Sequence, residues 1–193
     1  MERMREIIVT EFITADGVIE APGGGDHPHG GWTFKDVAFD EAAYEIKGRE
    51  QDEAGAMLIG RTSYEEFAPV WPSMTEEFAG YNAMPKYVVS TNLESAPWGD
   101  DDEATVLRSL DEVRALKETD GDPIIVHGSA TLAQGLAAAG LVDRYHLLVF
   151  PLVLGAGKRL FATDGSDKRV FSVTESETYP NGITKLVYAV TPA

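Results

Sequence analysis

The stretch "PIIVHGSATLAQGLAAAGLVDRYHLLVFPLVLG" (Pro123–Gly155) decides the fold. It begins with an apolar run of strand length, turns at Gly128–Ser129, and continues in a helical pattern up to Gly140, a typical helix-ending glycine. A second continuous apolar run begins at Arg144. Strand, helix and strand in this order are typical of a parallel sheet that is buried on both faces. Pro151 predicts a bulge or an interrupted ladder, because proline has no N–H to donate.

The rest of the chain repeats this alternation of apolar runs and helical patterns. Strands are expected at Arg5–Thr14, Gly55–Gly60, Lys86–Thr91 and Ala104–Leu107, and two more around a turn at Pro180–Gly182. Helices are expected over Asp36–Gln51, from an N-cap at Thr62 or Ser63, and from a capping box at Ser109–Glu112. The segment Glu20–Phe34, rich in glycine and histidine, is expected to be a loop. The prediction is an α/β fold with a mixed, mainly parallel sheet, helices on both faces, a C-terminal hairpin, and one domain over residues 1–193.

Composition excludes several classes of function. The formal net charge of −16 disfavours nucleic acid and anionic membranes as partners. The chain contains no cysteine, so it has no disulfide, no zinc–thiolate site and no thiol nucleophile. It has no apolar run of about 18 residues, and its N-terminus reads directly into a strand. A soluble cytoplasmic protein is therefore the expectation.

Three of the expected strands end in small or hydroxyl residues, in "IGRTS", "VSTN" and "HGSAT". The carboxyl ends of parallel strands share one edge of a sheet, and a helix N-terminus there offers free N–H groups to a phosphate. Arg61 would add a charge-assisted contact. Each motif taken singly also fits a routine helix N-cap, and the glycine-rich turn of an ordinary dinucleotide-binding domain is absent after the first strand.

These motifs resemble the dihydrofolate-reductase-like superfamily. Within it the chain is similar to stand-alone relatives of the reductase domain of the bifunctional riboflavin-biosynthesis deaminase–reductase. The resemblance runs nearly end to end, through "TADGVIEAP", "IGRTSYEEFAPVWP", "YVVSTNL", "IIVHGSATLAQGL" and "GLVDRYHLLVFPLVLGAGKRLF". It implies a three-layer fold with a sheet of about eight strands.

The resemblance also implies NADPH as cofactor and a homodimer. It puts Gly60, Arg61 and Thr62 on the cofactor phosphates, Ser90 and Thr91 at the adenosine end with its 2′-phosphate, and Gly128 and Ser129 on the pyrophosphate. The implied activity is reduction of a pyrimidine-like or pteridine-like heterocycle, as in 5-amino-6-(5-phosphoribosylamino)uracil reductase. The alternatives are a non-catalytic nucleotide-binding protein on this fold, or a dihydrofolate reductase. The second is weakened because no carboxylate motif marks the first long helix.

The expected substrate pocket lies between the "TADG" turn and that helix. Asp16 either holds the turn together or touches substrate. Trp32 is expected to stack on a flat heterocycle, and Asp40 to face a ring nitrogen. With Lys35 as the nearby cation, a neutral or weakly anionic substrate is expected.

No metal site is expected, because His27 and His29 lack a third ligand at a suitable spacing. His127 and His146 are expected to be structural histidines with satisfied hydrogen bonds. The apolar segment Tyr145–Leu154 and the free edge of the C-terminal hairpin favour a homodimer.

Overall fold

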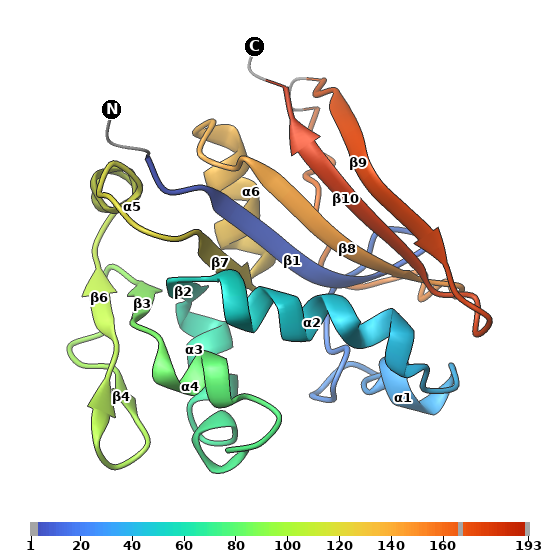
Figure 1. The fold of residues 1–193 in the computed structure, drawn as a ribbon, viewed down its shortest axis with the longest axis horizontal. Coiled ribbons are helices and arrows are strands. Elements are labelled where there is room, and N and C mark those ends of the chain that lie inside the picture. Colours follow the sequence, from blue (N-terminus) through green and yellow to red (C-terminus); the bar gives the residue numbers. More distant parts are fainter. Residues whose placement is uncertain (1–3, 166–167, 192–193) are drawn as a thin grey trace.

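The computed structural model describes residues 4–165 and 168–191, and its central feature is a sheet of eight strands (Figure 1). The strand order is β6-β3-β2-β7-β1-β8-β10-β9. The six strands from β6 to β8 are parallel, β10 is antiparallel to β8, and β9 is antiparallel to β10. The mixed, mainly parallel sheet with a C-terminal hairpin is therefore confirmed.

The strands of this sheet are β1 (Ile7–Thr14), β2 (Ala56–Gly60), β3 (Lys86–Val89), β6 (Thr105–Leu107), β7 (Ile124–His127), β8 (Arg144–Phe150), β9 (Phe171–Thr178) and β10 (Thr184–Val190). A separate two-stranded ribbon consists of β4 (Pro97–Trp98) and β5 (Asp102–Glu103). The helices are α1 (Trp32–Lys35), α2 (Glu41–Glu53), α3 (Arg61–Phe67), α4 (Ala79–Ala83), α5 (Leu110–Lys117) and α6 (Ala130–Ala138), with a 3-10 turn at Trp71–Ser73.

Helices cover both faces of the sheet, with α2 on one face and α6 on the other (Figure 1). The side chains of β8 point alternately to the two faces and belong to two core clusters. Tyr145 and Leu147 belong to the cluster with α5 and α6, whereas Leu148 and Phe150 belong to the cluster with α2. Strand β8 is thus an interior strand that is buried on both faces. Helices therefore cover the apolar residues of β8, and the homodimer expected from them stays a prediction. Pro151 follows the last residue of β8 and ends the strand instead of forming a bulge within it.

Two helix starts differ from the sequence prediction. Helix α2 begins at Glu41 rather than Asp36, because the Asp40 side chain accepts a hydrogen bond from the Ala42 amide and caps it. Phe39, at helical spacing with the buried Ile46, lies before the helix and is 74% exposed. Helix α3 begins at Arg61, with Gly60 as its N-cap and no capping side chain, so the caps expected at Thr62 or Ser63 are wrong.

No helix formed by the described residues combines the length and the hydrophobicity that crossing a bilayer requires.

Candidate functional site

Strand β1 extends beyond its neighbour β7 at the carboxyl edge of the sheet. It pairs with β7 only over Ile7–Thr10, whereas β8 pairs with it as far as Thr14. In the part of the chain that the structure describes, residues 11–14 have no strand partner on the side facing β7. Ligands of open α/β sheets bind at such a place.

Two strand ends meet beside this open edge of β1. The Gly60 amide, at the end of β2, donates to Ser129 Oγ over 2.9 Å, and the hydroxyls of Ser63 and Ser129 are 2.7 Å apart. A Cβ at Gly60 would lie 2.4 Å from Ser129 Oγ, and one at Gly128 would lie 2.7 Å from Ser63 Oγ. Glycine is therefore required at both positions, and it brings the starts of α3 and α6 together.

The end of β3 lies close to two guanidinium groups. Arg61 Nη1 and Ser90 Oγ both donate to Asn92 Oδ1, over 3.0 and 3.2 Å. Arg108, which follows the adjacent strand β6, donates from Nη1 to the Ser90 carbonyl over 3.1 Å. Arg61 also forms an exposed ion pair with Glu65, whereas Arg108 takes part in none of the ion pairs found among residues 4–165 and 168–191.

The structure thus brings together Arg61 and Ser90, and places Thr62 and Thr91, both exposed, beside them in the chain. Asn92 and Arg108 were missed by sequence reasoning. Asn92 stands directly after "VST" and could have been noticed there. Arg108 is brought next to Ser90 only by the pairing of β3 with β6, in which Val89 is opposite Leu107.

Asp16 holds its turn together. Its carboxylate accepts hydrogen bonds from Thr14 Oγ1 over 2.6 Å and from the Gly155 amide over 2.9 Å. The hydrogen bond from Thr14, together with those from the Gly155 and Leu154 amides, lowers the pKa of Asp16. The turn interpretation is therefore the one that the contacts support.

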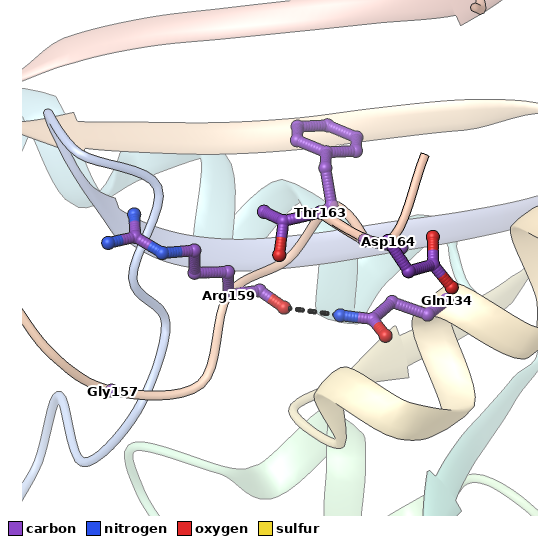
Figure 2. A pocket seen from close by; sticks show the side chains of 7 residues that line it. Gln134, Gly157, Arg159, Thr163 and Asp164 are labelled. Atoms are coloured by element: carbon purple, nitrogen blue, oxygen red, sulfur yellow. Dashed lines mark hydrogen bonds between the residues drawn. The ribbon is translucent and has the colours of Figure 1, made fainter. Parts of the chain in front are cut away.

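Arg159 links this turn to an open cleft of about 370 Å³ beside α6. Its guanidinium donates to the Asp16 carbonyl, and its own carbonyl accepts from Gln134 Nε2 over 2.8 Å. Figure 2 shows the Arg159 side chain directed away from Gln134, toward the loop after β1. Gly157, Thr163 and Asp164 line the same cleft.

Two of the residues expected in the substrate pocket have structural roles. Trp32 is fully buried, its indole N–H donates to the Glu20 carbonyl over 2.9 Å, and its ring packs edge-on against Phe150. It cannot stack on a substrate without leaving the core, so that expectation is wrong. The Asp40 carboxylate caps α2, as described above, which accounts for an acidic residue at this position without a substrate.

A buried ionic network lies between β1, β8 and α2, and sequence reasoning missed it. Thr10 Oγ1 and His146 Nδ1 contact Glu50 Oε1 over 2.7 and 2.9 Å. Lys47 Nζ and the Tyr81 hydroxyl donate to Glu50 Oε2, each over 3.3 Å, and Lys47 also donates to Thr10 Oγ1. Burial acts to raise the pKa of Glu50, but the Lys47 charge and the His146 hydrogen bond outweigh it and lower the pKa to about 2. Glu50 is therefore a carboxylate, and His146 donates to it from Nδ1.

A second carboxyl in the same region has the opposite character. Burial raises the pKa of Glu11 to about 8, against the opposing field of Lys47, so this side chain is a neutral acid at pH 7. Burial also lowers the pKa of His127 to about 3, with Lys47 acting in the same direction. The Nε2 atoms of His127 and His146, like Glu11 Oε1, are buried without a hydrogen-bond partner in the described part of the chain. The expectation that both histidines are satisfied is wrong.

The ring of His27, in the first loop, binds two backbone groups. His27 Nδ1 accepts from the His29 amide over 3.1 Å, which leaves Nε2–H to donate to the Ala156 carbonyl, also over 3.1 Å. Within the described ranges, no three His, Cys, Asp or Glu side chains gather as metal ligands would.

Comparison with known proteins places this chain among related sequences. The family model described as "RibD C-terminal domain" matches residues 5–185. The uncharacterized protein YyaP of Bacillus subtilis (strain 168) is 27% identical over 196 residues, which cover 96% of this chain and 95% of that protein.

Three solved structures share the fold. A putative riboflavin biosynthesis protein from Shewanella sp. PV-4 has a TM-score of 0.74 at 19% identity, over 97% of this chain and 99% of that one. A pyrimidine reductase-like protein from Corynebacterium diphtheriae has a TM-score of 0.64 at 14% identity, over 98% and 93%. Dihydrofolate reductase from Enterococcus faecalis, complexed with NADP(H) and a second ligand, has a TM-score of 0.59 at 12% identity, over 100% of each chain. The dihydrofolate-reductase-like fold expected from the sequence is confirmed.

Proposed function

Because this chain belongs to the RibD C-terminal domain family, we propose that it is an NADPH-dependent reductase of a pyrimidine-like or pteridine-like heterocycle. The observation that carries the proposal is the convergence of Gly60, Gly128 and Ser129 beside the open edge of β1, with Arg61 and Arg108 at the next strand end. Two structural neighbours are named as riboflavin-biosynthesis or pyrimidine-reductase-like proteins, and the third binds NADP(H).

The residues present fit such a cofactor. The tight contact between the Gly60 and Gly128 turns leaves backbone and small hydroxyl groups at the edge, where a pyrophosphate can approach closely. The guanidiniums of Arg61 and Arg108 supply positive charge for a 2′-phosphate, on a chain whose net charge is −16. Bound NADPH would supply the hydride, while this chain binds, orients and shields the reacting groups from water.

We expect NADPH to bind about 10- to 100-fold more tightly than NADH, because a charge-assisted contact is worth about 1.5–3 kcal/mol. Arg108→Ala should reduce this preference by about tenfold and leave NADH binding unchanged. The matched control is Arg114→Ala, on the exposed face of α5. Calorimetric titration of both nucleotides measures the effect. If the unaltered protein binds NADPH and NADH equally tightly, Arg61 and Arg108 do not bind a 2′-phosphate.

An activity assay on the same protein distinguishes a reductase from a non-catalytic nucleotide-binding protein. NADPH oxidation is followed with aminopyrimidines and pteridines, each with and without a ribosyl phosphate. Turnover of any of these supports the reductase. Tight NADPH binding without turnover of any of them would favour the non-catalytic alternative.

We also propose a homodimer formed through the C-terminal hairpin. An aromatic row runs in the order Phe161, Tyr145, Phe171 and Tyr188, with neighbouring ring centroids 5.3–5.5 Å apart. Phe161 at its end is 39% exposed, and Val173 beside it is 58% exposed. A partly exposed apolar row at a sheet edge is better covered by a second subunit than by water. Light scattering at micromolar concentration should give about twice the 20.9 kDa of the chain, and Val173→Asp should return it to the monomer mass. A monomer mass for the unaltered protein contradicts the dimer.

A further inference from the structure

The strongest unassigned feature is Lys47, whose ammonium lies beside the open edge of β1. Its side chain reaches from α2 to Thr10, the last residue of β1 that pairs with β7. The ammonium also lies 4.9 Å from the centre of the Phe12 ring, and Phe12 belongs to the part of β1 that β7 does not cover. A cation over an aromatic face is a favourable arrangement that fixes the position of the charge.

An aromatic wall stands beside this ammonium. The rings of Phe12 and Tyr44 are half-buried with centroids 5.6 Å apart, and Tyr44 in turn lies 5.0 Å from the ring of Phe39. A flat heterocycle can pack against such a wall and present its edge to Lys47. These rings, unlike the fully buried Trp32, are partly exposed and can offer the stacking surface that the sequence suggested for Trp32.

The network behind Lys47 holds it in place without competing for the ligand. Glu50, whose side chain is 1% exposed, is bonded by Thr10, Tyr81 and His146 and so cannot follow Lys47 outward. Lys47 itself is 15% exposed. Within the described residues its Nζ donates two hydrogen bonds, to Thr10 and Glu50, and an ammonium has three N–H donors. One donor is therefore left for a ligand.

We infer that Lys47 selects the substrate, and that the substrate is a flat heterocycle whose edge carries oxo groups or a negative charge. A carbonyl oxygen or a deprotonated ring nitrogen accepts the remaining N–H of the ammonium. An amino-substituted, protonated ring would instead place donor against donor and cation against cation. Lys35, the cation named from the sequence, donates to the Gly30 carbonyl. This inference rests on the proposed reductase function and names the substrate class of that same site.

The experiment uses protein saturated with NADP⁺ and two probes of similar shape. Lumazine (2,4-dioxopteridine) presents oxo groups, and 2,4-diaminopteridine presents amino groups. The unaltered protein should bind lumazine at least about tenfold more tightly than the diamino compound. Lys47→Met should remove that preference while NADP⁺ affinity stays within about twofold, since the dinucleotide contacts lie at other strand ends. The matched control, Lys35→Met, should change neither.

Two further variants keep the test decisive. Lys47→Met alone leaves Glu50 without its cation, so the double variant Lys47→Met/Glu50→Gln removes both charges and guards against loss of folding. Lys47→Glu should invert the preference toward the diamino compound. Failure of lumazine to bind the NADP⁺-loaded protein, tighter binding of the diamino compound, or an unchanged preference in the folded Met variants overturns the inference. Failure of the unaltered protein to bind NADP⁺ at all would instead overturn the proposed function.

Discussion

Glu50→Gln is expected to lower the free energy of unfolding by about 3–5 kcal/mol, the usual cost of removing one charge from a buried ion pair. The amide has nearly the same volume as the carboxylate, so the loss reports on charge and not on a cavity. Lys47 and His146 would each keep a buried donor facing a neutral group. Urea denaturation at fixed protein concentration measures the difference.

The pH dependence of this effect follows from the pKa of Glu50. The folded value of about 2 lies below the unfolded value of 4.5, so the stabilisation is complete above pH 4.5. It is lost as the pH falls toward 2, and the difference between the variant and the unaltered protein should shrink over that range. Glu53→Gln, at an exposed position of the same helix, should change stability by less than about 0.5 kcal/mol. A loss below about 1 kcal/mol for Glu50→Gln would mean that the network does not hold the carboxylate as described.

Glu11→Gln should have the opposite effect and stabilise the protein at high pH. The pKa of Glu11 is about 8 in the folded chain against 4.5 when unfolded, so the folded state keeps a proton that the unfolded state releases. Stability therefore falls as the pH rises through this interval, by about 1.4 kcal/mol per unit and about 4–5 kcal/mol in total. Glutamine has no proton to release and avoids this loss.

The measurement is the difference in unfolding free energy between Glu11→Gln and the unaltered protein at several pH values. It should be small at pH 4.5 and grow steadily up to pH 8. The control is Glu94→Gln, in the exposed loop after β3, for which the difference should not grow. A difference that is constant with pH would place an ionised carboxylate at Glu11.

The elements that local patterns specify were predictable from the sequence. The β7–α6–β8 unit carries its own signals, namely two apolar runs, the Gly128–Ser129 turn and the glycine after the helix. The Ser109 cap of α5 was equally legible, since Ser109 Oγ accepts from the Glu112 amide as the capping box requires. The start of α2 was not predictable in this way. Phe39 follows the helical spacing, yet it lies before the first turn of α2 and packs on the Tyr44 ring from there.

The candidate site was predictable only where one residue type carries the signal. Gly60 at the end of β2 and Gly128 directly after β7 indicated from the sequence that another group comes close to the backbone there, and the structure shows Ser129 and Ser63 in these places. Glu50 could not be assigned in this way, because its partners Thr10 and His146 lie 40 and 96 residues away along the chain. Only the register that places Thr10 opposite His146 turns these residues into one network. In the sequence alone, Lys47 and Glu50 look like the charged face of an ordinary surface helix.

The central position of β1 has a consequence for synthesis of the chain. On one edge it pairs with β7, where Ile7 lies opposite Ile124, and on the other edge with β8, where Ile8 lies opposite Arg144. Both neighbours of β1 are therefore synthesised more than 100 residues after it. During translation β1 emerges with two unpaired edges and an apolar sequence, and it stays so until β7 and then β8 leave the ribosome. We expect chaperones that hold extended apolar segments to bind this strand on nascent chains, and to be released once the segment through Phe150 has emerged.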